Sequence, residues 1–274
     1  MIELPEAAVL SKQLSIELSG KEIVEVIVAQ NPHKFAWYSG DPALYDGYLS
    51  HNQIKGANSY GGQVELQAGD MTLVFSDGVN LHYHSKNDPP PGKHQLFLKF
   101  DDETSLSATI SMYGGLLCTP NGKNDNQYYL IAKEKPSPLG ESFNLDYFLE
   151  LFTPLDEKLS LKAFLATNQR IPGLGNGVLQ DILFNARFHP KKKVNSLDET
   201  EKKDLFNAVK NTLSKMSELG GRDTEKDFYG NPGGYISILS KNTLNTPCKR
   251  CGSQIIKEAY LGGSIYYCSG CQSV

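Results

Sequence analysis

Arginine is absent from the first 150 residues of this 274-residue chain. That half contains 10 Lys against 19 Asp and Glu, a net charge of −9. Residues 151–274 contain 17 Lys and Arg against 12 acids, a net charge of +5. The first half therefore lacks an extended cationic surface, and if a polyanion binds, the second half provides most of the attraction.

Long apolar runs are also absent, and the N-terminus has neither a basic segment nor the apolar core of a signal peptide. We therefore expect a cytoplasmic, monomeric protein with no membrane span. Because the sequence shows no sign of secretion, structural disulfides are disfavoured for its five cysteines. The length and the 39% hydrophobic content are enough for a sizeable core and indicate two domains.

Four of the five cysteines form two C-x-x-C pairs that are separated by sixteen residues, namely Cys248, Cys251, Cys268 and Cys271. This spacing is typical of a four-thiolate zinc site, which is structural because no position stays open for a catalytic water. We expect one zinc ion on a ribbon hairpin with strands at 254–261 and 264–268 and a turn at Gly262 and Gly263. Two disulfides are the alternative. Cys118 fits a small apolar core residue.

Short strand-like runs at 23–28, 63–66, 71–75, 95–100 and 115–118 follow a candidate helix at 11–19, in which Leu10, Leu14 and Leu18 face a core. Helical patterns follow at 145–152, 160–167, 175–186 and 197–217, the last with Ser196 and Glu199 as a capping box. The sequence predicts an α+β multidomain protein: a β-sandwich with a leading helix (1–143), a helical domain (144–240) and a zinc ribbon (241–274).

The glycine-rich stretch 169–177 opens a helix, and the free N–H groups of such a helix start suit a phosphate. Plain turn chemistry is the alternative for this stretch taken by itself.

Three motifs in this order resemble the formamidopyrimidine-DNA glycosylase and endonuclease VIII family: ELPE at 3–6, GLGNG at 173–177 with QDILF at 180–184 and HP at 189–190, and PCKRCG at 247–252 with YCSGCQ at 267–272. The resemblance covers the whole chain. It implies an N-terminal β-sandwich with a leading helix, a helix-two-turns-helix module, a zinc ribbon, and DNA bound in the cleft between the two domains.

The resemblance also implies roles for individual residues. Glu3 matches the acid that helps open the deoxyribose and activate the leaving base, and Glu6 matches a second acid near the lesion. Asn176, beside Gly175, matches the phosphate-binding asparagine. Residues 220–235 resemble the segment with the loop that closes over an everted base. Lys249 and Arg250, between the first two cysteines, are further candidate DNA contacts.

The sequence departs from the family where catalysis and DNA contact are expected. The family's bifunctional members use the amine of an N-terminal proline as nucleophile; here residue 2 is Ile2, so we expect Met1 to persist with its α-amine as a displaced substitute.

Four further positions differ. Gly62 takes the place of a phosphate-contacting lysine, and Val79 that of an intercalating methionine, as a shorter wedge. Met112 or Tyr113 replaces the arginine that fills the void left by the base. Gly263 stands where the ribbon has a phosphate-gripping arginine. We expect weak binding to ordinary duplex DNA.

Two functions from different classes remain open. The first is a base-excision-repair glycosylase that acts on damaged duplex or single-stranded DNA, with Glu3 as general acid or base and with weak or absent AP-lyase activity. The second is a catalytically inactive family member that binds damaged, abasic or single-stranded DNA. The ELPE motif favours the enzyme, while the missing nucleophile favours the binder.

Overall fold

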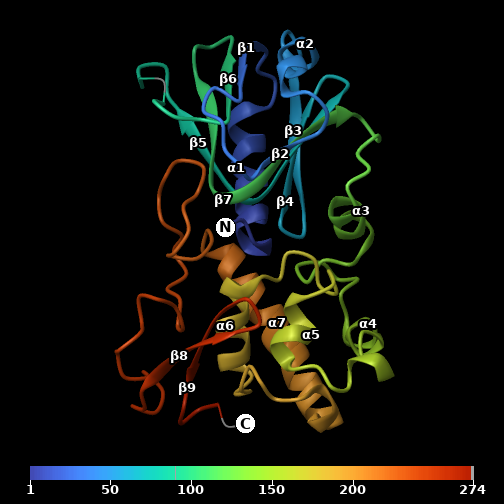
Figure 1. The fold of residues 1–274 in the computed structure, drawn as a ribbon, viewed down its shortest axis with the longest axis vertical. Coiled ribbons are helices and arrows are strands. Elements are labelled where there is room, and N and C mark those ends of the chain that lie inside the picture. Colours follow the sequence, from blue (N-terminus) through green and yellow to red (C-terminus); the bar gives the residue numbers. More distant parts are fainter. Residues whose placement is uncertain (90, 273–274) are drawn as a thin grey trace.

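The computed structural model describes residues 1–89 and 91–272. Figure 1 shows the sheet at one end of the molecule, together with the helix of residues 4–18. The helices between residues 145 and 218 and the C-terminal ribbon lie at the other end. The helices are α1 (Leu4–Leu18), α2 (Tyr45–Leu49), α3 (Gln127–Glu134), α4 (Leu145–Glu150), α5 (Leu161–Ala166), α6 (Asn176–Asn185) and α7 (Glu199–Glu218). Short 3-10 turns lie at Pro42–Leu44, Pro154–Asp156 and Val194–Ser196.

The strands of the first half form a β-sandwich-like sheet in the order β1-β6-β7-β5-β4-β3, with β2 parallel to β7. Their bounds are β1 Ile23–Val28, β2 Ala36–Tyr38, β3 Ile54–Tyr60, β4 Gln63–Ala68, β5 Met71–His84, β6 Leu96–Phe100 and β7 Ser105–Pro120. Because β5 and β7 are long, the first part of β5 pairs with β4 and the later part lies beside the β6 end of β7. The predicted sandwich is confirmed.

An irregularity in the β5–β7 ladder divides these two parts. Asp77 is opposite Gly114, but Val79 is already opposite Ile110, so Gly78 faces Ser111, Met112 and Tyr113 across a bulge. Gly78 is required there, because an added Cβ would lie 2.5 Å from the carbonyl oxygen of Tyr113. Bulges bend strands and redirect side chains.

Helix α1 buries Leu10, Leu14 and Leu18 against the sheet, as the sequence predicts. It begins at Leu4, seven residues before the expected start. Pro5 is compatible with the first helical turn, and the Glu6 carboxylate accepts a hydrogen bond from the N–H of Glu3 at 3.3 Å. The ELPE motif is therefore the start of a helix.

The helical half has its own apolar core, in which α6 and α7 contribute the largest share. It includes Val178, Leu179, Ile182, Leu205, Val209 and Leu213. The cap of α7 differs from the predicted one: the Glu201 N–H donates to Asp198 Oδ1 at 2.8 Å, and the Asp198 N–H donates to Glu201 Oε2 at 3.3 Å. Ser196 with Glu199 and Asp198 with Glu201 both have the spacing of a capping box. Ser196 belongs to the preceding 3-10 turn, so Asp198 is the residue that caps α7.

The ribbon consists of β8 (Ile255–Tyr260) and β9 (Gly263–Cys268) and lies against α6. Gln180 joins the two: its Oε1 accepts from the Tyr266 N–H at 3.0 Å, and its Nε2 donates to the Ser264 carbonyl at 3.2 Å. Among the helices of the described ranges, none is long and apolar enough to cross a bilayer.

Candidate active site between the two cores

A cleft of about 920 Å³ lies between the sandwich and the helical half. The sandwich contributes Met1, Glu3, Trp37, Asp77, Met112 and Tyr113 to its lining, and the opposite side contributes Lys162, the loop 173–176 and the hairpin turn 261–263. Lys162 is the one Lys or Arg among the lining residues that the structure describes. The cleft therefore offers much apolar and aromatic surface and little positive charge.

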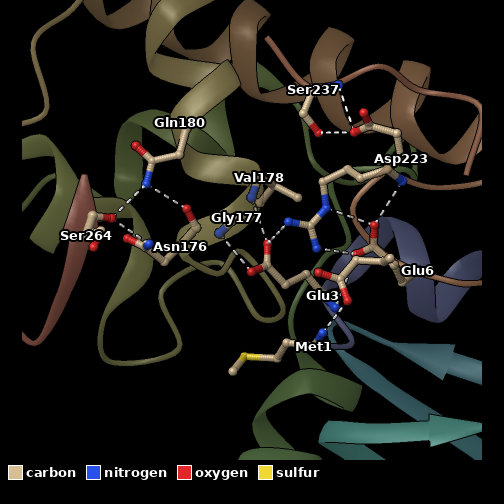
Figure 2. A network of polar contacts seen from close by, with 12 residues as sticks. Met1, Glu3, Glu6, Asn176, Gly177, Val178, Gln180, Asp223, Ser237 and Ser264 are labelled. Carbon is tan, nitrogen blue, oxygen red and sulfur yellow. Dashed lines mark hydrogen bonds and ion pairs between the residues drawn. The ribbon is translucent and has the colours of Figure 1, made fainter. Parts of the chain in front are cut away.

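Glu3 joins the two halves at the base of this cleft (Figure 2). Its carboxylate oxygens accept hydrogen bonds from the N–H groups of Gly177 and Val178, each at 2.8 Å, at the start of α6. The N–H of Leu4 donates to the Gly173 carbonyl at 2.9 Å. Glu3 is 5% exposed, so the acidic group that meets the positive end of α6 is a side chain of the protein itself.

This arrangement corrects one expectation. The helix start does present N–H groups to an anion, but Gly177 and Val178 donate theirs to Glu3 and do not offer them to a phosphate.

Arg222 lies buried between the two acids of the ELPE motif. Its Nε and Nη2 donate to Glu6 at 2.9 and 2.8 Å, and its Nη1 is 3.5 Å from Glu3 Oε2. Arg222 is 3% exposed. Sequence reasoning missed it, since a lone arginine 216 residues from Glu6 carries no local signal.

The two acids respond differently to this environment. Burial raises the pKa of Glu3, and the charge of Arg222 only partly opposes the rise. Burial also disfavours the charged form of Glu6, but the charge and hydrogen bonds of Arg222 outweigh it and lower the pKa of Glu6. Glu6 is thus the ionised partner of Arg222, while Glu3 is the acid that more readily holds a proton.

Two glycines of the GLGNG motif make this packing possible. A Cβ on Gly175 would lie 2.5 Å from Glu3 Oε1, and one on Gly177 would lie 1.7 Å from Arg222 Nη1. These side-chain atoms would have to shift. The motif therefore admits Glu3 and Arg222, a role beyond turn formation.

Asn176 faces the ribbon. Its Nδ2 donates to the Ser264 carbonyl at 2.8 Å, while its Oδ1 is buried with no hydrogen-bond partner among the described residues. Lys162 donates to the Tyr260 carbonyl at the other end of the same turn. A Cβ on Gly263 would lie 3.5 Å from Lys162 Nζ, so these residues surround the position where the resemblance implies an arginine.

The N-terminus lies where the two halves meet. The N–H of Ile2 donates to the Asp77 carbonyl at 2.6 Å, so this peptide nitrogen is not a nucleophile. The α-amine of Met1 forms an ion pair with Glu225. Met1 lines the cleft. That its α-amine substitutes for the family nucleophile stays a prediction.

The wedge predicted at Val79 is wrong. Val79 is 2% exposed and packs in the core of the sandwich, because the bulge turns it away from the cleft. Met112 is 64% exposed in the cleft, and Tyr113 packs beside Trp37 with ring centroids 5.6 Å apart. Trp37 is half exposed and was missed, since a single tryptophan on a three-residue strand has no distinguishing pattern.

The segment after Arg222 runs back to the sandwich. Phe228 is fully buried in the sandwich core, and its carbonyl accepts from the Tyr83 N–H at 2.8 Å. This segment and β5 enclose a second cavity of about 580 Å³, lined by residues that include Met1, Glu6, His82, His84, Glu225 and Asp227. His82 and His84 lie on β5, as expected for strand histidines.

The four predicted metal ligands come together. The sulfur atoms of Cys248, Cys251, Cys268 and Cys271 lie within 4.8 Å of one another, and all four thiols are free. The set fits a tetrahedral metal ion that is bound by thiolates, as zinc is. Lys249 and Arg250 do not line the cleft. Arg250 instead packs on Phe184 and donates to its carbonyl at 3.0 Å, which attaches the ribbon to α6.

Comparison with known proteins identifies the family. The formamidopyrimidine-DNA glycosylase H2TH domain model matches residues 135–227. A formamidopyrimidine-DNA glycosylase of Histophilus somni is 31% identical over 290 residues, covering 99% of each chain. The chain belongs to the formamidopyrimidine-DNA glycosylase family. The glycosylase of Cytobacillus firmus is 26% identical and covers 99% of this chain and 100% of its own.

Solved structures of the family share this fold over the whole chain. Lactococcus lactis Fpg in complex with abasic-site DNA has a TM-score of 0.85 at 22% identity, covering 99% of this chain and 100% of that one. A variant of the same Fpg bound to DNA with a Fapy-dG lesion also has a TM-score of 0.85 at 22% identity, with the same coverage. The order of sandwich, helical domain and ribbon predicted from the family resemblance is confirmed.

Proposed function

We propose that this family member is a base-excision-repair glycosylase that hydrolyses the N-glycosidic bond of a damaged base. The observation that carries the proposal is the place of the ELPE motif. Glu3 lines the cleft and Glu6 lines the second cavity, on either side of Arg222, and their pKa values are shifted in opposite directions. Such pairs of acids are typical of sites of acid and base chemistry.

AP-lyase activity is weak or absent in this proposal. The nitrogen of residue 2 is a peptide N–H that donates to the Asp77 carbonyl, and the α-amine of the adjacent Met1 is paired with Glu225. A Schiff base at Met1 requires this ion pair to open and the amine to lose its proton. Hydrolysis by water avoids both requirements.

The second cavity is the proposed site for the everted base. The segment that follows Arg222 covers it, and its lining offers carboxylates, imidazoles and hydroxyls, which are groups that hydrogen-bond a base edge. Met1 lines both this cavity and the cleft, which supports the proposal that a base everted from a strand in the cleft enters the cavity.

The DNA partner is proposed to be damaged and at least locally unpaired. Trp37, Tyr113 and Met112 offer stacking surface, whereas Lys162 is the one Lys or Arg side chain in the described lining. Stacking is worth about 1–3 kcal/mol per base and needs an unstacked strand, while duplex affinity depends on phosphate contacts. The protein acts as a monomer in the cytoplasm, where reduced thiols can hold the ribbon's zinc.

An inactive DNA-binding protein is the second candidate, since the Glu3 oxygens already accept two amide hydrogen bonds and face Arg222. The deciding experiment incubates the purified protein with duplex and single-stranded oligonucleotides that carry different damaged bases. Base release is measured with borohydride trapping in parallel. Release without a trapped adduct supports the proposed hydrolase. An adduct at Met1 indicates the amine mechanism, and tight binding to abasic DNA without any release supports the binder.

A further inference from the structure

Asp77 is an acid that no motif singles out, and it lines the cleft beside Glu3, Met1 and Tyr113. It lies at the end of the regular first part of β5, where the bulge with β7 begins. Its φ is 59°, in the left-handed region, which Asp and Asn adopt more readily than other residues with a side chain. The pairing of β5 with β7 on both sides of the bulge holds this backbone in place.

The Asp77 carboxylate is more available than that of Glu3. Among the described residues, its one hydrogen bond comes from the neighbouring Ser76 hydroxyl, at 2.9 Å to Oδ2. No described Lys, Arg or His lies within ion-pair distance of it. Glu3, by contrast, accepts from Gly177 and Val178 and faces Arg222, so binding a water would require that network to open.

Asp77 also lies beside the position that the family nucleophile would occupy. Its own carbonyl accepts the hydrogen bond from the nitrogen of residue 2, at 2.6 Å. Tyr113, across the bulge, feels the charges of both Asp77 and Glu3: burial raises its pKa, and these two carboxylates raise it further. The carboxylate thus shares one corner of the cleft with the N-terminus and with Glu3.

We propose that Asp77 is the general base that activates the hydrolytic water, in place of the absent amine nucleophile. The inference rests on the glycosylase function proposed above. As the water oxygen forms a bond to C1′ of the sugar, Asp77 takes one proton from the water. The glycosidic C1′–N bond breaks, and its electron pair leaves with the base, whose nitrogen takes a proton from solvent. Asp77 then returns its proton to solvent, leaving a free base and an abasic sugar.

The surroundings of Asp77 suit this task. Burial raises the pKa of Asp77, and the hydrogen bond from Ser76 opposes the rise only in part. A carboxylate whose pKa lies nearer to neutrality is a stronger base toward water. The bulge serves both sides of the site, because it directs Asp77 from β5 and Met112 and Tyr113 from β7 into the same cleft.

The test is single-turnover base release by Asp77→Asn on the substrate found for the unmodified protein. Asn tolerates the left-handed conformation as well as Asp does, so the backbone should stay in place. We expect the rate to fall by about 100-fold or more, the range for loss of a general base. Affinity for an oligonucleotide with a tetrahydrofuran abasic-site analogue should change less than about threefold, because no positive charge is lost.

Asp70→Asn is the matched control, because Asp70 is a fully exposed acid in the turn before the same strand. It should keep the unmodified rate. In Asp77→Ala, added formate should restore part of the activity by acting as a substitute base. An Asp77→Asn rate within twofold of the unmodified protein, or a borohydride-trapped adduct at Met1 in the unmodified protein, would overturn the inference while the glycosylase function stands. Absence of release by the unmodified protein overturns both.

Discussion

The two walls of the cleft differ in what they offer to DNA. The sandwich wall presents rings, a thioether and carboxylates, from Trp37, Tyr113, Met112 and Asp77, and its 150-residue half contains no arginine. The opposite wall presents Lys162, Asn176 and the turn of the ribbon. The first wall is thus suited to stacking and proton transfer, and the second to holding the backbone. The two walls are joined by Arg222, which contacts both Glu3 and Glu6. Figure 2 shows these two acids close together beside the start of α6.

The largest effect is expected from Arg222→Met, which removes the buried contacts of Arg222 with Glu3 and Glu6. Two carboxylates would be left buried without their cation, which costs about 3–5 kcal/mol of unfolding free energy. Urea unfolding at pH 7 measures it. Lys86→Met breaks an exposed ion pair with Glu103 and should cost less than about 1 kcal/mol. Equal losses of unfolding free energy in the two variants would show that the contacts of Arg222 with Glu3 and Glu6 do not stabilise the protein.

Loss of the metal from the ribbon should abolish DNA binding and leave the sandwich folded. Cys268→Ser takes one thiolate from the four-sulfur set, and metal binding and local folding are coupled in such modules. Zinc content and the anisotropy of a labelled abasic oligonucleotide measure the two effects. Cys118→Ala, a buried thiol of the sandwich, should keep both. Unchanged DNA affinity in Cys268→Ser would show that the ribbon is not part of the surface that binds DNA.

The contributions of Glu3 and Glu6 to stability should change with pH in opposite directions. The folded-state pKa of Glu6 is lowered, so its stabilising contribution is present above the ordinary value of about 4.3 and is lost as the pH falls through the folded pKa. At pH 7, Glu6→Gln should be less stable by about 1–3 kcal/mol, and the difference should shrink in acid.

Glu3 has a raised pKa, so its protonated form contributes stability below the ordinary value, and this contribution is lost as the pH rises through the folded pKa. The stability difference between the unmodified protein and Glu3→Gln should therefore narrow as the pH rises. Urea unfolding from pH 3 to 8 measures both variants. Parallel pH dependences would contradict the assignment of Glu6 as the ionised partner of Arg222.

The smallest effect concerns the sandwich wall alone. Trp37→Ala should weaken single-stranded DNA binding by about 5- to 100-fold through the loss of one stacked base, and Trp37→Phe should restore most of it. Fluorescence anisotropy at fixed salt measures this. Tyr48→Ala, an exposed aromatic on α2 outside the cleft, is the control. A loss for duplex DNA as large as that for a single strand would contradict stacking on an unpaired base.

Much of the fold could be predicted because its signals are local. The strand at 23–28 matches β1, and the helix predicted at 175–186 contains α6. The segments that were missed lack such signals. Strand β3 carries Lys55, Gly56, Asn58 and Ser59 and shows no apolar alternation, yet it pairs with β4 along its length. Helix α3 is short and exposes Tyr128 and Leu130 while it buries Tyr129 and Ala132, so its apolar residues do not mark one buried face.

For the site, the sequence by itself determined the four-cysteine set, the start of α6 and the family, because each depends on residues a few positions apart or on motif order. Only the tertiary structure decided how these parts are used. Arg222 meets Glu6 across 216 residues, and the bulge that faces Asp77 into the cleft forms only when β5 and β7 pair. Buried ion pairs and redirected side chains depend on how separate segments dock, and a linear pattern does not record that.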